Sequence, residues 1–332
     1  MSIKLKAALI SLAMGILIGA LKFYAFFETQ AMAIGSDAIE SLNNVVAALF
    51  SAYAIWQGEK KEDFRHLYGK GRLEYFSAAF EGALILFSGV WILFESGMRF
   101  LKPTQLENLP LGLGFLVFAT LLNALLSSYL VRAGKKQHSP ALIADGLHVW
   151  SDVASSLGVL GGLFLVWLSG WNILDNCVSI LMGFWILWSG LALIRKSFAQ
   201  LMDRADPELL DRIQKILTEY RKMPMIYPHE LRLRELGSKV LIDFHLVVPR
   251  FLQIHELHQF EKDCAEFIRQ KLERPLGMMI HADPCKNIYC RVCSMTNCPI
   301  RSSAQEYDLP WNLNLLVNRV PEWIRLGHKN PD

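Results

Sequence analysis

The segment ALIADGLHVWSD, residues 141–152, decides the fold because it places reactive polar side chains inside an apolar stretch that continues to Leu168 without another charge. His148 and Asp152 are four residues apart, so on a helix both side chains fall on one face. A charged group at the centre of a membrane helix costs about 2.5–3.5 kcal/mol and normally faces a bundle interior or an ion pathway. The pattern therefore predicts a membrane helix that carries half of a divalent-metal site.

A second apolar stretch repeats this pattern. The segment SDAIESLNN, residues 36–44, aligns with residues 144–152, so that Asp37 matches Asp145, Glu40 matches His148 and Asn44 matches Asp152. The two helices would offer three oxygen-bearing side chains and one imidazole, a set suited to zinc, iron, cobalt or manganese. The predicted ligands are Glu40, Asn44, His148 and Asp152. Taken singly, they could instead be a proton carrier at Glu40, an interhelical hydrogen bond at Asn44 and a satisfied interior histidine at His148.

The first two hundred residues hold most of the long apolar runs. A membrane helix needs about 20 largely apolar residues, and that criterion predicts six spans. They are 7–27, 33–56, 75–98, 109–132, 141–168 and 172–194. We therefore expect a six-helix transmembrane domain over 1–200.

Lysine and arginine predict the orientation of these spans. The basic loop residues Lys60, Lys61, Arg65, Lys70, Arg72, Arg132, Lys135 and Lys136 follow the second and fourth spans, whereas the alternate loops hold only Arg99 and Lys102. Basic loops stay on the cytoplasmic side. Both termini should therefore be cytoplasmic, in a protein of the inner membrane.

The remainder of the chain predicts a soluble α+β domain over 201–284. A helix is expected at about 206–221, two strands at 229–236 and 239–248 around the Gly237-Ser238 turn, a helix at 254–272 and a strand at 276–282. This α-β-β-α-β order fits a small open sheet covered by helices on one face.

A tail over 285–332 carries a compact group of cysteines. Cys285, Cys290, Cys293 and Cys298 follow a C-x4-C-x2-C-x4-C spacing. Such clustering indicates metal binding in a reducing compartment, with zinc or an iron–sulfur cluster as the candidates. The alternative is a reduced tail without a metal. The net charge of +3 is too small to indicate nucleic acid as a partner.

Together these features resemble the cation diffusion facilitator family of divalent-metal transporters. The resemblance covers about residues 1–284 and includes the loop HLYGKGRLE, residues 66–74. It implies a homodimeric, proton-coupled metal exporter in membrane lipid, a secondary transporter and not an enzyme, with a metallochaperone-like cytoplasmic domain that helps hold the dimer together.

The resemblance also implies ligand positions. The transport site falls on the four residues named above, a loop site on Asp63 and His66, and a cytoplasmic site on His229, His245, His258, His281 and Asp283. The chain departs from the family pattern in two places. Members usually have Asp or His at position 40 and Asp at position 44, and Lys70 stands at the third ligand position of the loop. An ammonium has no acceptor and repels a cation, so we expect the loop site to be empty or weakened.

The sequence therefore predicts efflux of divalent metal from the cytoplasm by alternating access, with zinc favoured and iron(II) next. Cobalt, manganese, nickel and cadmium also suit the ligand set. A membrane-anchored metal or redox sensor that works through the cysteine tail is the alternative from another class. A passive channel is the third possibility, and proton dependence of transport would separate it from an exporter.

Overall fold

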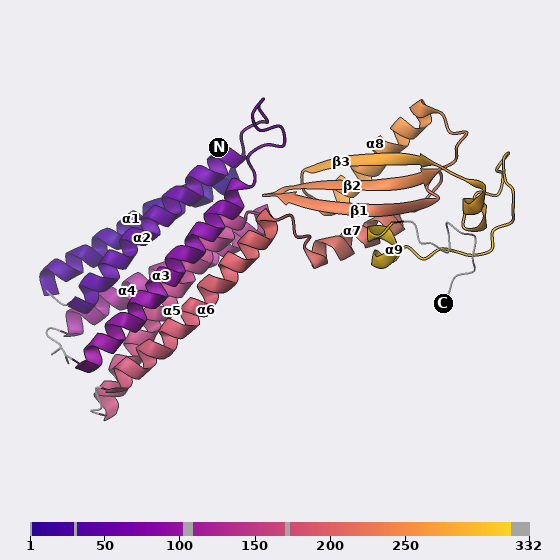
Figure 1. The fold of residues 1–332 in the computed structure, drawn as a ribbon. Coiled ribbons are helices and arrows are strands. Elements are labelled where there is room, and N and C mark those ends of the chain that lie inside the picture. The colour runs from indigo at the N-terminus through magenta and orange to yellow at the C-terminus, as the bar shows by residue number, and fades with distance from the viewer. Residues whose placement is uncertain (1, 30–31, 102–108, 170–172, 320–332) are drawn as a thin grey trace. The chain divides into compact units, whose positions relative to one another are not determined.

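The computed structural model describes residues 2–29, 32–101, 109–169 and 173–319, and the chain divides into two compact units, Met1–Met202 and Asp203–Asp332. The first unit contains six long helices (Figure 1). They are α1 (Ile3–Thr29), α2 (Met32–Gly58), α3 (Leu73–Leu101), α4 (Leu109–Gln137), α5 (Pro140–Ser169) and α6 (Ile173–Leu201). Each contains or closely matches one of the six spans expected from the sequence.

Three described stretches are long and apolar enough to cross a membrane. They are Ile3–Tyr24, Leu73–Met98 and Val117–Gln137, in α1, α3 and α4. Three of the six expected spans therefore meet this criterion over the described residues, and the count of six stays a prediction.

The bundle is apolar on its outside and polar within. Large side chains such as Phe87, Trp91 and Trp188 are at least half exposed, whereas Asn44, Asp145 and Asp152 are buried. In a water-soluble protein this distribution would be reversed. It suits a surface that faces hydrocarbon and an interior that holds polar groups.

Close packing of α3 against α6 depends on small residues. A Cβ atom added to Gly190 of α6 would lie 3.0 Å from the carbonyl oxygen of Gly82 on α3. Glycines at such positions let two helix backbones approach. A buried ion pair also ties α1 to α3, since Lys4 Nζ donates to Glu74 Oε1 at 2.7 Å, and Ser139 donates to the other carboxylate oxygen.

The second unit is a three-stranded mixed sheet with two main helices. Its elements are α7 (Pro207–Glu219), β1 (Tyr227–Leu236), β2 (Lys239–Val248), α8 (Ile254–Leu272), β3 (Leu276–Pro284), the short helix η1 (Asn287–Arg291) and α9 (Leu313–Val317). The sheet order is β1-β2-β3, with β1 antiparallel and β3 parallel to β2. The α-β-β-α-β order expected from the sequence is present.

Alternation along β2 decides which face of the sheet is buried. Ile242, Phe244 and Leu246 pack into one core with α7 and α8. Residues at odd positions of β2, including His245 and Val247, must therefore lie on the opposite face. That second face, here called the open face, carries the candidate ligands of the cytoplasmic domain.

Candidate metal sites

The transmembrane candidate site lies where α2 packs against α5. Asn44, His148 and Asp152 are 8%, 1% and 4% exposed, so all three are inside the bundle. Asn44 Oδ1 lies 2.6 Å from His148 Nε2, and Asn44 Nδ2 donates to Asp152 Oδ2. The structure therefore brings together three of the four residues predicted as transport ligands, from two helices far apart in sequence.

The Asn44 amide constrains the histidine proton. Because the amide nitrogen donates to Asp152, the amide oxygen is left to accept, and His148 Nε2 must then carry the hydrogen. His148 Nδ1 has no hydrogen-bond partner among the described residues. A cation that takes Nε2 as its ligand must displace this proton or move it to Nδ1.

The side chains of Glu40 and Asp37 lie outside the described residues, although both positions belong to α2. The fourth predicted transport ligand stays a prediction. Its spacing of four residues from Asn44 puts the two positions on one face of α2.

A small polar cavity adjoins the site. Asn44 lines it together with Ser11, Ser41 and Asp145, which is 1% exposed. Asp145 also interacts electrostatically with Glu81 on α3, a fully buried side chain whose two carboxylate oxygens have no hydrogen-bond partner among the described residues. Glu81 was not among the residues predicted from the sequence. Its signal was present, because it is a carboxylate in the middle of an apolar span.

In the predicted loop site, Asp63 forms an ion pair with Lys70. Asp63 Oδ1 lies 3.0 Å from His66 Nδ1, and Asp63 Oδ2 lies 3.2 Å from Lys70 Nζ. Hydrogen bonds, first that with His66, hold the pKa of Asp63 well below its ordinary value. The Lys70 ammonium therefore occupies the position where a third ligand would stand.

Strand register assembles the cytoplasmic candidate site. His229 on β1 pairs with His245 on β2, which pairs with His281 on β3, and Asp283 is two residues further along β3. Cross-strand partners share a face of the sheet, so these four side chains gather on the open face. A residue-level pattern alone could not reveal this, because it depends on how the three strands align.

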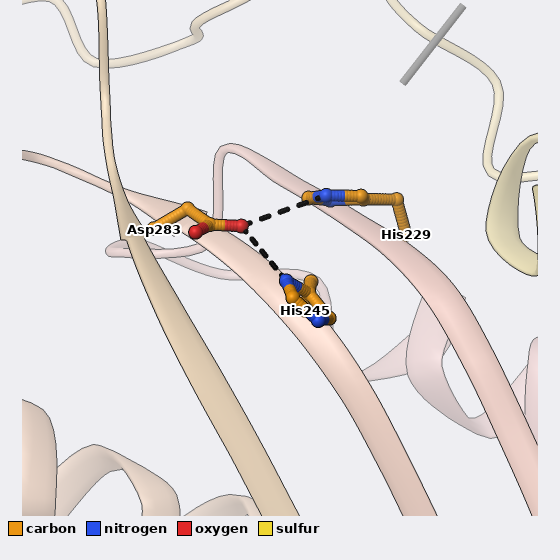
Figure 2. A group of neighbouring side chains, drawn as sticks. All are labelled: His229, His245 and Asp283. Atoms are coloured by element: carbon orange, nitrogen blue, oxygen red, sulfur yellow. Dashed lines mark hydrogen bonds and ion pairs between the residues drawn. The ribbon is translucent and has the colours of Figure 1, made fainter. Parts of the chain in front are cut away.

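Asp283 is the centre of this group (Figure 2). Its Oδ2 lies 3.1 Å from His245 Nδ1 and 3.5 Å from His229 Nε2. Candidate ligand atoms of these three residues lie within 4.8 Å of one another, and they form the one such group of histidine, cysteine and acidic residues in the described part of the chain. Two imidazoles and a carboxylate leave a position open, as a zinc-type site with an exchangeable fourth ligand requires.

The other two predicted ligands of this domain differ in position. His281 Nε2 lies 3.6 Å from Asp283 Oδ1, next to the three-residue group. His258 is on α8, where Nδ1 lies 3.9 Å from Glu261 Oε2 and the side chain is 64% exposed.

The environment of His229 favours its neutral form. Burial lowers the pKa of His229 below its ordinary value, although Asp283 acts in the opposite direction. Tyr227 stacks on the His229 ring at a centroid distance of 5.4 Å.

The four tail cysteines line a single cavity at the end of β3. All four are free thiols, and so is Cys264, which lies on the side of α8 that is buried in the core. Burial raises the pKa of Cys264 to about 12, which makes it unreactive at neutral pH. Cys264 and the four tail cysteines therefore occupy different environments.

Comparisons with known proteins agree with this architecture. A family model described as the cation efflux transmembrane domain matches residues 8–202, and one described as the cation efflux protein cytoplasmic domain matches residues 205–285. An uncharacterized transporter of Synechocystis is 33% identical over 268 residues, which are 80% of this chain and 85% of the relative. The cation-efflux pump FieF of Salmonella typhimurium is 27% identical over 281 residues, 84% of this chain and 92% of the pump.

A bundle with buried polar side chains and a cytoplasmic domain with a cluster of candidate metal ligands suit a membrane protein that handles cations. The chain belongs to the cation efflux family, the cation diffusion facilitators. It is therefore a transmembrane transporter that exports divalent cations, and the family supports a homodimer as its assembly.

Proposed function

We propose that this protein exports divalent metal from the cytoplasm in exchange for protons, through a site made of Glu40, Asn44, His148 and Asp152. Zinc is the favoured substrate and iron(II) the next, because one imidazole among oxygen ligands suits ions of borderline hardness. The observation that carries the proposal is the direct contact of Asn44 with both His148 and Asp152 inside the bundle.

The energetics of burial support a transport role for this contact. Polar side chains inside a membrane bundle destabilise the fold unless they hydrogen-bond to one another or bind an ion. This applies to the carboxylate, the imidazole and the amide of this site. Asn44 satisfies Asp152 and His148 when no cation is bound, so the ligands stay inside the bundle without an ion. A cation replaces these hydrogen bonds with coordination bonds, and Asn44, His148 and Asp152 are already adjacent.

Competition between the cation and protons supports the coupling. Metal ligands must be deprotonated, so metal binding releases protons and protonation expels the metal. A metal that takes His148 Nε2 as its ligand competes with the proton that this nitrogen donates to Asn44. In the proposed cycle the cation enters from the cytoplasm, the helices rock, and protonation of His148 and a carboxylate lowers affinity on the far side. We propose that Asp145 and Glu81 accept and release these protons.

We assign the remaining predicted sites to supporting roles. The cluster on the open face would bind metal and offset the repulsion between two cytoplasmic domains of a dimer, while the Asp63–His66 pair would bind little or no metal. The basic loops support an inner-membrane location with both termini in the cytoplasm. The tail over 285–332 would be a separate metal-binding part.

The two other classes are disfavoured by different observations. A sensor anchored by its helices has no use for a buried carboxylate and imidazole that contact one amide between two helices. A channel needs no group whose protonation competes with the ion. Its flux would continue unchanged when the proton gradient is removed.

The test is metal-driven proton flux in vesicles that contain the purified protein. We expect His148→Ala and Asp152→Ala each to lower the zinc-driven flux by at least a hundredfold, while size-exclusion chromatography still finds a dimer. The matched control is Ser151→Ala on the same helix, because the Ser151 hydroxyl donates to the Leu147 carbonyl of its own helix at 3.1 Å. A panel of metals in the same vesicles ranks the substrates.

Two outcomes would reject the proposal. Wild-type flux in both variants would remove the site from the transport pathway. Zinc transport without any proton movement in the unaltered protein would leave efflux standing and reject the exchange.

A further inference from the structure

The cysteine tail begins as a continuation of the sheet. Cys285 follows β3 directly, and its N–H donates to the Val248 carbonyl at 2.9 Å, which extends the pairing of β2 with β3. Helix η1 then presents Cys290, and the following turn presents Cys293. Together with Cys298 they line one cavity, so a segment of fourteen residues places four cysteines around a common space.

Hydrogen bonds to sulfur surround the two central cysteines. The Ser302 hydroxyl lies 3.5 Å from Cys290 Sγ, and the backbone N–H groups of Ser302 and Ser303 also donate to this sulfur. The N–H of Met295 donates to Cys293 Sγ. Donors aimed at sulfur stabilise thiolates and orient metal ligands. Three of these four donors serve Cys290 and one serves Cys293.

Arg301 holds the central turn closed. Its guanidinium donates to the carbonyl of Cys290 at 3.2 Å, to that of Cys293 at 2.9 Å and to that of Met295. The same cation interacts electrostatically with the Cys290 and Cys293 sulfurs. A centre with four thiolates carries excess negative charge, and this arginine offsets part of it.

The turn is anchored on the open face of the sheet. Val292 and Cys293 are 3% and 6% exposed and share an apolar core with Tyr227 and Val247. Tyr227 also stacks on His229, so the cysteine cavity adjoins the histidine cluster through one aromatic ring. The two groups have separate donor sets, since no cysteine belongs to the cluster around Asp283.

We propose that Cys285, Cys290, Cys293 and Cys298 form a four-thiolate metal centre that fastens the tail to the open face. This centre is distinct from the transport site and from the histidine cluster. The family model for the cytoplasmic domain ends at residue 285, so three of the four ligands lie beyond it.

The spacing of the sulfurs bears on what the centre contains. With Zn–S bonds of about 2.3 Å, tetrahedral geometry places sulfurs about 3.8 Å apart around one zinc ion. No three of these four sulfurs lie within 4.8 Å of one another. An iron–sulfur cluster spreads its four thiolates over several irons and so holds them wider apart than one zinc does. Zinc and an iron–sulfur cluster would use the same four ligands, so the iron, zinc and sulfide content of the protein distinguishes them.

The experiment uses the full chain in detergent, purified without oxygen, with iron, zinc and sulfide measured per protomer. We compare the unaltered protein with Cys290→Ser/Cys293→Ser and with Cys264→Ser, the matched control for loss of a buried thiol. His229→Ala/His245→Ala is included to remove the neighbouring cluster. We expect the control and the histidine variant to keep one metal centre that the double cysteine variant loses completely. Iron with sulfide and visible absorption identifies a cluster, and colourless zinc identifies a single ion.

Thiol labelling gives a readout that needs no variant. We expect maleimide to leave the four tail thiols unmodified in the metal-loaded protein and to modify all four after chelation, with Cys264 unmodified in both states. Equal metal content in the unaltered protein and the double cysteine variant would overturn the proposal. Tail thiols that react equally before and after chelation, or that are joined as disulfides in the anaerobic protein, would overturn it as well.

Discussion

Asn44 Oδ1 lies 2.6 Å from His148 Nε2, although the two residues are 104 positions apart in the chain. The same amide donates to Asp152 from its nitrogen. Because an amide can donate and accept at once, it satisfies an imidazole N–H and a carboxylate together, which a carboxylate at this position could not do. The departure from the family pattern at position 44 therefore has a structural consequence. It stabilises the ion-free arrangement and reduces the negative charge available to a cation.

Replacing this amide with a carboxylate should strengthen metal binding. In Asn44→Asp a fourth charged or ionisable ligand faces the cation, and we expect the half-saturating zinc concentration for proton flux to fall about tenfold, about 1.4 kcal/mol. The maximal rate should fall as well, because release then needs an additional protonation. Asn123→Asp adds the same charge at a buried amide of α4 that lines the adjoining cavity and is not one of the proposed ligands. A similar gain in both variants would attribute the effect to net charge alone.

The positions of the six long helices along the chain could be predicted largely from apolar runs of sufficient length. Six long runs gave six helices, and the repeated four-residue spacing identified Asn44, His148 and Asp152 before any contact was known. Glu81 was overlooked because it has no partner at helical spacing in its own span. Its environment comes from Asp145 on another helix, and such packing is not encoded in the local pattern.

In the cytoplasmic domain the helices and strands could be predicted from the sequence, whereas the contact among the candidate ligands could not. The strands and helices follow from alternation and from the Asp206-Pro207 helix start, where the Asp206 side chain accepts from the Glu208 N–H. The union of His229, His245 and Asp283 required the register of three strands, which includes an irregularity between His229 and Arg232. The family resemblance implied the ligand positions, and strand pairing brought three of these residues together.

The histidine cluster should bind metal independently of the transmembrane site. His245→Ala removes the histidine whose ring nitrogen lies closest to the Asp283 carboxylate, at 3.1 Å. We expect the full-length protein to lose the metal bound at this cluster, measured by equilibrium dialysis with zinc. His255→Ala is the control, since this histidine is exposed on α8 and outside the cluster. Equal zinc stoichiometry in the two variants would contradict the assignment.

The loop that contains Asp63 and His66 should gain a metal site when Lys70 is replaced by a carboxylate residue. In Lys70→Asp, a carboxylate takes the place of the ammonium that lies 3.2 Å from Asp63 Oδ2, and Asp63, His66 and the new Asp supply three ligands. We expect one additional zinc equivalent per protomer by isothermal titration.

Lys61→Asp makes the same change of charge at an exposed position of the same loop and separates ligation from attraction. An extra equivalent in Lys61→Asp as well, or none in Lys70→Asp, would show that Lys70 does not block the site.

Tight packing of α3 on α6 predicts different tolerance at two glycines. In Gly190→Ala the new methyl lies 3.0 Å from the Gly82 carbonyl oxygen and from the Leu86 backbone nitrogen, so the helices must separate. We expect a loss of about 1–3 kcal/mol in stability, measured as a lower unfolding temperature in detergent. Gly97→Ala is the matched control on α3, because its Cβ meets nothing within 4 Å. It should unfold at or slightly above the temperature of the unaltered protein, since alanine favours a helix over glycine. Equal unfolding temperatures for the two variants would mean that the α3–α6 contact is looser than the glycine pair requires.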